Sequence, residues 1–217
     1  MARVEHYFTP FDEGCFYHVY NRTIDKQPMF KSENNFDFFL KQYNKYLSPV
    51  VDTYAYCLLK NHFHILLRVK EDHLMTSDLI TFQKLANLPI TNLVGKTTHD
   101  LVTHQFRKFF QSYAMAFNKE QSRVGTLFQT PFKRVLVKDE SYFTQLIYYI
   151  HSNPQHHHLV DDFRKWKWSS YERILLNKPS ALKKKEVIGW FGNKSIYEEY
   201  HACLQKVLLD ERLLFED

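Results

Sequence analysis

Glycine is scarce in this sequence, with five residues among 217. A phosphate-binding loop of the dinucleotide or P-loop type needs glycines at fixed spacing, and neither a G-x-G-x-x-G nor a Walker pattern is present. The sequence therefore argues against a nucleotide cofactor bound through such a loop. It also contains no motif for the use of a nucleotide as an energy source.

Cysteines are few and long apolar runs are absent. Cys15, Cys57 and Cys203 are far apart and form no C-x-x-C pair, which argues against a disulfide framework and fits a reducing compartment. The chain does not open on an apolar signal segment, and it lacks the run of about 18 apolar residues that a membrane span needs. These features predict a soluble, cytoplasmic protein.

Aromatic residues are abundant, at 17% of the chain, and the formal net charge is +5. A chain of this length can bury a core without disulfides, and we expect most aromatic rings to lie in that core. A basic groove lined by aromatic faces is also typical of proteins that bind single-stranded nucleic acid. The composition leaves such a partner open.

The order of expected elements predicts an α+β fold. Alternating or β-branched runs predict strands over 15–23, 51–59, 62–69 and 131–139. Helical periodicity predicts helices over 33–47, 100–120 and 140–153, with Ser32 and Asp139 as caps and Pro154 as the end of the third. Residues 71–99 read as a loop or a short helix. The order β-α-β-β-α-β followed by a helix is the ferredoxin-like arrangement, with helices on one face of an antiparallel sheet.

The expected domain covers residues 1–175, and residues 176–217 form a helical extension that can pack on the same domain. Within the domain, the run "LLKNHFHILLRV" places His62 and His64 two residues apart in a strand, so both side chains project from the same face. Two neutral imidazoles in that arrangement can bind one divalent metal ion. Because the H-x-H pattern is short and common, two half-exposed histidines without a ligand are the better explanation of this pair taken alone.

A second pair of polar side chains lies in the helix expected over 140–153. Tyr149 and Asn153 are four residues apart and share a helix face, beside the apolar stripe that the helix presents to the core. A phenolic hydroxyl can act as a nucleophile, and an amide oxygen can complete a metal shell. An amphipathic tyrosine at a helix border and an asparagine near a helix end are the simpler explanation of these two residues alone.

Five sequence blocks in a fixed order resemble one family. "YAYCLLKNHFHILLRV" resembles the metal-binding segment of the HUH-type single-tyrosine transposases. "LIYYIHSNPQHHHLV" and "FRKWKWSSYE" are similar to the later blocks of that family, and "YHVYNRTIDKQPMF" and "VGTLFQTPFKRVLV" to the earlier ones. The blocks span residues 15–175, and the subgroup that carries them is the REP-associated tyrosine transposases.

This resemblance implies a site and a reaction. It implies His62, His64 and Asn153 as ligands of Mg²⁺ or Mn²⁺, and Tyr149, rather than the adjacent Tyr148, as the nucleophile. The implied reaction cleaves single-stranded DNA beside a hairpin, leaves a 5′-phosphotyrosine link and a free 3′-hydroxyl, and can then join strands. The resemblance implies either a monomer or a homodimer.

One departure from the family lies in "NPQHHHLV", where relatives carry small or glycine-containing residues before "LV". Three consecutive histidines, His156, His157 and His158, do not converge on one ion in regular structure, so we expect a polar turn there.

DNA contacts are harder to predict, because most basic and aromatic residues have ordinary surface or core positions. The candidates for phosphate contacts are Arg22, Arg107, Lys108, Lys133 and Arg134, and those for base stacking are Tyr17, Phe128 and Phe132. Two other functions stay open. One is a metal-dependent phosphodiesterase that uses water, and the other is a non-catalytic protein that binds DNA hairpins.

Overall fold

The computed structural model describes residues 9–85 and 95–203. Its centre is a four-stranded antiparallel sheet in the order β2-β3-β1-β4. The strands are those expected from the sequence, each within a few residues of its expected bounds: β1 (Phe16–Arg22), β2 (Val51–Leu58), β3 (His62–Val69) and β4 (Lys133–Val137). The fold is therefore of the α+β class.

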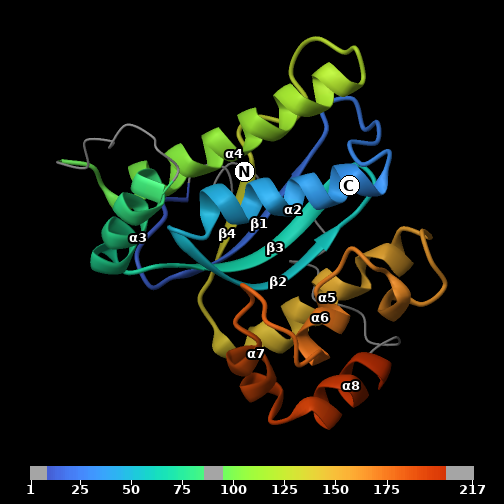
Figure 1. Cartoon of the computed structure of the whole chain (residues 1–217). Helices are drawn as coiled ribbons and strands as arrows, with labels where there is room; N and C mark the ends of the chain where they lie inside the picture. Colours follow the sequence, from blue (N-terminus) through green and yellow to red (C-terminus); the bar gives the residue numbers. More distant parts are fainter. Residues whose placement is uncertain (1–8, 86–94, 204–217) are drawn as a thin grey trace, which may run out of the picture.

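Helices cover both faces of the sheet (Figure 1). The two long helices expected from the sequence, α2 (Glu33–Leu47) and α4 (Thr98–Glu120), pack together on one face. The opposite face is covered by the later helices, α5 (Phe143–His156), α6 (Tyr171–Leu175), α7 (Lys184–Phe191) and α8 (Lys194–Cys203). The sheet thus lies between two helical layers, which bury most of the side chains on both of its faces.

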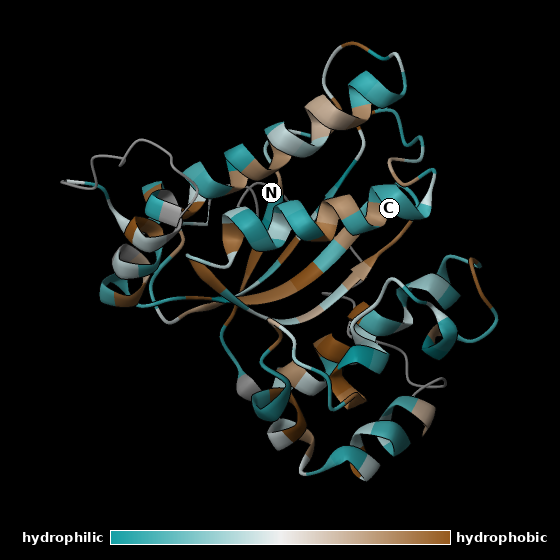
Figure 2. Ribbon diagram, viewed as in Figure 1, coloured by the Kyte–Doolittle hydropathy of each residue, from teal (hydrophilic) through white to brown (hydrophobic). Residues whose placement is uncertain are grey.

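Two apolar cores fill the spaces between these layers, and the hydrophobic residues concentrate on the sheet and on the helix faces turned toward it (Figure 2). Between the sheet and α2–α4, the core is largely aromatic. The ring of Phe39, for example, lies 5.1 Å from Phe63 and 4.9 Å from Phe109, measured between centroids. Such packing accounts for most of the aromatic content, as expected from the sequence.

Of the two alternatives expected for residues 71–99, a loop or a short helix, the structure has a helix, α3 (Asp72–Leu85), while residues 86–94 lie outside the described part. The expected end of the third helix was wrong. Pro154 does not end α5, which continues to His156, where the N–H of His157 donates to the carbonyl oxygen of Asn153 at 2.9 Å. A proline in the last turn costs only the one bond that its missing N–H would have made, so the helix tolerates it there.

The described part of the C-terminal extension, residues 176–203, joins the second core, and residues 204–217 lie outside the described part. Val187 and Phe191 of α7 and Tyr197 of α8 are buried with the apolar face of α5. Asp139, the expected cap of α5, instead accepts from the N–H of Ser141 at 2.9 Å, in a 3-10 turn (Glu140–Tyr142) that precedes the helix. None of the helices in the described ranges is long and apolar enough to cross a membrane.

Candidate active site

The pairing of β1 with β3 gathers three histidines on the sheet face that α5 covers. His64 lies opposite Tyr20, and His62 lies opposite Arg22. His18 is two residues before Tyr20 and so projects from the same face. Its Nε2 lies 3.1 Å from Nδ1 of His64, and both imidazoles are buried. The two histidines of the H-x-H pattern therefore belong to a larger polar cluster.

Helix α5 lies across this cluster. The ring of Tyr149 lies 5.7 Å from that of His64, nearly perpendicular to it, and the ring of His157, just after the helix, lies 4.7 Å from that of His62. Asn153 is four residues from both Tyr149 and His157, so it shares their helix face and lies between the two contacts. The fold thus brings three of the residues predicted from the sequence, His62, His64 and Tyr149, to one place, and the helical spacing puts Asn153 on the same face of α5 as Tyr149.

Hydrogen bonds orient two of the candidate metal ligands, His62 on β3 and Asn153 on α5. Nδ1 of His62 lies 2.7 Å from Oδ1 of Asn61. An amide oxygen only accepts, so Nδ1 carries the proton and Nε2 keeps its lone pair. The side-chain amide nitrogen of Asn153 donates to the carbonyl oxygen of Tyr149 at 2.8 Å, which leaves its Oδ1 as the atom able to bind a cation.

Burial keeps these imidazoles neutral. It lowers the pKa of His62 to about 3, and the nearby charges of His157 and Arg22 act in the same direction. Burial also lowers the pKa of His64 well below its usual value. A neutral imidazole is the form that binds a metal ion, so both side chains are in the ligating form at neutral pH.

The donor set fits a divalent ion bound mainly by solvent and substrate. Among the described residues, no three His, Cys, Asp or Glu side chains come together in a way that would hold a metal. The available protein donors are two imidazole nitrogens and one amide oxygen. Mixed nitrogen and oxygen ligation of this kind suits Mn²⁺, and Mg²⁺ usually keeps several non-protein ligands.

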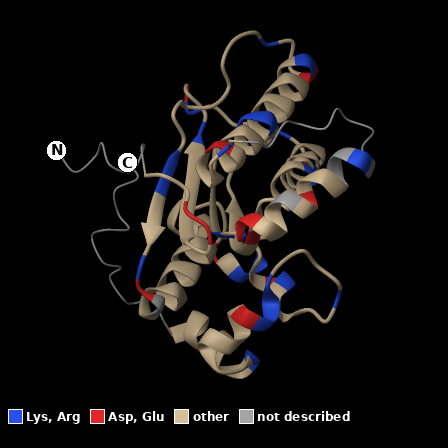
Figure 3. Ribbon diagram, turned by 90° about the vertical axis from the view of Figure 1, so that its left-hand side faces the viewer, with Lys and Arg blue, Asp and Glu red and all other residues tan. Residues whose placement is uncertain are grey.

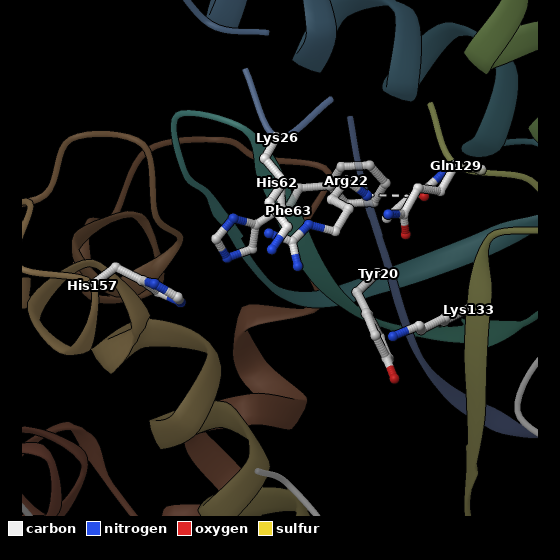
Figure 4. Close-up of a pocket in the computed structure, with 9 residues that line it drawn as sticks. Tyr20, Arg22, Lys26, His62, Phe63, Gln129, Lys133 and His157 are labelled. Atoms are coloured by element: carbon white, nitrogen blue, oxygen red, sulfur yellow. Dashed lines mark hydrogen bonds between the residues drawn. The ribbon is translucent and has the colours of Figure 1, made fainter. Parts of the chain in front are cut away.

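An open pocket of about 130 Å³ adjoins His62 (Figure 4). Two of the side chains predicted to contact DNA, Arg22 and Lys133, line it. The ammonium of Lys133 lies 5.2 Å from the centroid of the Tyr20 ring. The remaining lining residues are Asn21, Lys26, Phe63, Gln129 and His157.

Three of the predicted DNA contacts are wrong, because their side chains are buried on the other side of the sheet. Tyr17 is 0% exposed, and its hydroxyl donates to the carbonyl oxygen of Pro10. Phe128 is 4% exposed, and Arg134, at 6%, donates to the carbonyl oxygen of Thr9 and lies over the ring of Phe11. None of the three presents a surface to a nucleic acid.

The other candidates lie away from the histidine pair. Phe132 packs partly buried against the first core, with its ring 4.8 Å from that of Phe106. Arg107 is exposed and Lys108 half-buried, both on α4, across the sheet from the pair. Lys and Arg residues are spread over several elements, including strands at one edge of the sheet (Figure 3).

Sequence reasoning missed three residues of the site: His18, Asn61 and His157. His18 alternates with Tyr20 and Arg22, so the face it shares with the histidine pair follows once β1 is paired with β3. Asn61 directly precedes His62, in the turn between two strands. His157 lies two turns beyond Tyr149, a relation hidden by the expectation that the helix ends at Pro154.

No family model matches the sequence, and no curated protein matches it. Among solved structures, the chain is similar to that of a REP-associated tyrosine transposase bound to a REP hairpin. The TM-score is 0.51 at 14% sequence identity, over 78% of this chain and 85% of the other. At this identity the likeness concerns the fold alone: the chain shares its fold with a REP-associated tyrosine transposase.

Proposed function

We propose that this protein is an HUH-type transposase that cleaves and rejoins single-stranded DNA beside hairpins through a tyrosine nucleophile. The observation that carries the proposal is the placement of Tyr149 against His64, with Asn153 one helical turn further on. The fold likeness supports it, and the strand order β2-β3-β1-β4 supports a ferredoxin-like description of the sheet.

The reaction proposed for Tyr149 is an exchange of phosphate esters. Its phenolic oxygen attacks the phosphorus of one linkage as the bond from phosphorus to the 3′-oxygen breaks. The phenol loses its proton to solvent, and the departing oxygen gains one to become a 3′-hydroxyl. A second 3′-hydroxyl can then attack the phosphotyrosine and release the tyrosine. Each step exchanges one ester for another, so no nucleotide is required.

The residues proposed to hold the metal ion are His62, His64 and Asn153. Mg²⁺ or Mn²⁺, when bound there, would stabilise the negative charge that develops on the phosphate oxygens. Tyr149 supplies the nucleophile, while Asn61 and His18 hold the two imidazole rings. All of these groups belong to one chain, which supports an active site completed within a monomer.

Gel electrophoresis under denaturing conditions tests the proposal. The protein is incubated with end-labelled single-stranded DNA hairpins and Mn²⁺, beside the variants Tyr149→Phe and His64→Ala. We expect a slow covalent band in the wild type and none in either variant. Tyr148→Phe is the matched control and should keep the band, because the ring of Tyr148 packs against Phe163 and His201 rather than against His62 or His64.

The other outcomes identify the alternatives. Cleavage without a covalent band, retained in Tyr149→Phe, would indicate a phosphodiesterase that uses water. Hairpin binding without cleavage on any substrate would indicate a non-catalytic binding protein.

A further inference from the structure

The pocket beside His62 carries a concentration of positive charge that the tyrosine chemistry does not explain. Arg22 comes from the end of β1, Lys26 from the turn that follows, and Lys133 from the start of β4. No acidic side chain is among the described residues that line it. The nearby carboxylate of Asp25 lies 3.4 Å from the guanidinium of Arg123, which partly neutralises it.

Hydrogen-bond donors dominate the lining as well. Arginine and lysine donate to phosphate oxygens, and the side-chain amide of Gln129 adds a neutral donor. Nε of Arg22 is buried and has no hydrogen-bond partner within the described residues.

The pocket and Tyr149 contact different members of the histidine pair. Along β3, Tyr149 contacts His64, whereas the pocket and His157 lie beside His62. The pocket is lined by His62 and by neither His64 nor Tyr149 (Figure 4), so a phosphate held at the histidine pair would lie between the contact of Tyr149 with His64 and the pocket. In-line attack requires the leaving oxygen to depart on the side away from the nucleophile.

We propose that this pocket binds a backbone phosphate of the DNA segment that ends in the released 3′-hydroxyl. This inference rests on the proposed function, and it assigns Arg22, Lys26 and Lys133 to the phosphate next to the cleaved one, on its 5′ side. The pocket would retain the released strand, so that its hydroxyl stays near the phosphotyrosine for rejoining. His157 also lines the pocket, with its ring 4.7 Å from that of His62.

A binding assay that requires no chemistry tests the assignment. Fluorescence anisotropy with a labelled single-stranded hairpin DNA is measured without divalent ions, in the Tyr149→Phe background. The pocket variant is Lys26→Gln with Lys133→Gln, since both side chains lie outside the buried core. The control is Lys165→Gln with Lys185→Gln, which removes the same charge from exposed positions elsewhere.

We expect the pocket variant to bind about tenfold or more weakly at low salt, while the control changes less than about twofold. The slope of log affinity against log salt should fall by about 0.7 for each phosphate that the variant no longer neutralises. Equal decreases in affinity for the two variants would overturn the assignment to this pocket.

A second arm locates the phosphate. Single linkages are replaced by neutral methylphosphonate, and we expect the largest decrease in affinity at the linkage 5′ to the cleaved one. That decrease should disappear in the pocket variant, and its persistence there would contradict the proposal. If the pocket variant binds DNA as tightly as its parent while the wild type still forms the covalent band, the pocket assignment is overturned and the proposed function stands. If binding behaves as expected but no covalent band forms on any hairpin, the tyrosine chemistry is overturned and the pocket assignment stands.

Discussion

At the scale of single residues, the histidine pair depends on its neighbours as much as on its spacing. Asn61 fixes the proton of His62 on Nδ1, and His18 contacts Nδ1 of His64 at 3.1 Å. Side chains that orient metal ligands in this way contribute tenfold to a hundredfold to metal affinity in known sites. The H-x-H pattern of the sequence does not show which side chains orient the two histidines.

Asn61→Ala should therefore weaken Mn²⁺ binding by about tenfold, because the ring of His62 loses the acceptor that fixes its tautomer. Isothermal titration calorimetry on the full chain measures this. Asn61→Asp is the matched control, since it keeps an acceptor oxygen at the same position, and it should bind Mn²⁺ at least as tightly as Asn61→Ala. Unchanged affinity in Asn61→Ala would show that the asparagine has no part in ordering the site.

Strand alternation explains which site residues the sequence could predict. His62 and His64 share a face by spacing alone, and the helical spacing of Tyr149 and Asn153 is equally local. Tyr17 was assigned wrongly, because knowing that it lies on the other face from His18 requires knowing which helices cover each face. That information belongs to the tertiary structure and cannot be read from one segment.

At the scale of elements, a buried chain of hydrogen bonds holds α5 on the sheet. The carbonyl oxygen of Tyr197 only accepts, so Nδ1 of His201 donates to it at 2.7 Å. Nε2 of His201 then accepts from Nδ1 of His151 at 3.0 Å, and Nε2 of His151 accepts from the hydroxyl of Ser170 at 2.7 Å. Ser170 in turn accepts from the N–H of Tyr56 in β2 at 2.9 Å. This order of donors is the one that two neutral imidazoles allow, and burial favours that form by lowering the pKa of both His151 and His201.

Ser170→Ala should lower the free energy of unfolding by about 1–3 kcal/mol, because it leaves the N–H of Tyr56 and Nε2 of His151 without their buried partner. Urea unfolding measures this. Ser152→Ala is the control: its hydroxyl is also buried but donates only to the carbonyl of Tyr149 within the same helix, so the decrease should stay below about 1 kcal/mol. Equal decreases would contradict the account of how α5 is held.

This chain of bonds also shows where prediction from sequence stops. His151 lies in "YIHSNP" and Ser170 is the second serine of "WSSY", two blocks that the sequence presents separately. In the structure these two side chains are hydrogen-bonded to each other. Their separation of 19 residues gives no local signal. The helices and strands themselves were predictable, because their apolar periodicity is local, whereas α3 was not, because its sequence is mixed and polar.

At the scale of the whole molecule, the C-terminal extension is part of the fold rather than an appendage. Tyr197 is 0% exposed within the second core, while its neighbour Ile196 is 46% exposed. Tyr197→Ala should therefore cost about 3–5 kcal/mol of stability, and Ile196→Ala about 0.5 kcal/mol or less. Chemical denaturation of the two variants measures the difference. Similar small decreases in both would indicate that α8 contributes little to the core.

The buried histidines should make the protein sensitive to mild acid. Burial lowers the pKa of His18 to about 3 and that of His201 to about 4, from an unfolded value near 6.5. Above pH 6.5 neither state binds the proton. Between 6.5 and the folded pKa only the unfolded state binds it, so stability falls as pH falls. Each such group costs about 1.4 kcal/mol one unit below 6.5.

Urea unfolding at about pH 7.5 and pH 5.5, without divalent ions, measures this decrease in stability. His201→Gln should reduce the difference in stability between the two pH values, because it removes one of the imidazoles that only the unfolded chain protonates in this range. Stability that is equal at both pH values would contradict neutral burial of these imidazoles.

Peptide mass spectrometry can identify the residue that forms the covalent bond to DNA, which we propose is Tyr149. The protein is incubated with a single-stranded hairpin and Mn²⁺, then digested with nuclease and protease. We predict a peptide carrying a nucleotide through a phosphate ester, with fragmentation that assigns the added mass to Tyr149. A nucleotide on Tyr148, or cleaved DNA with no modified peptide, would contradict the claim.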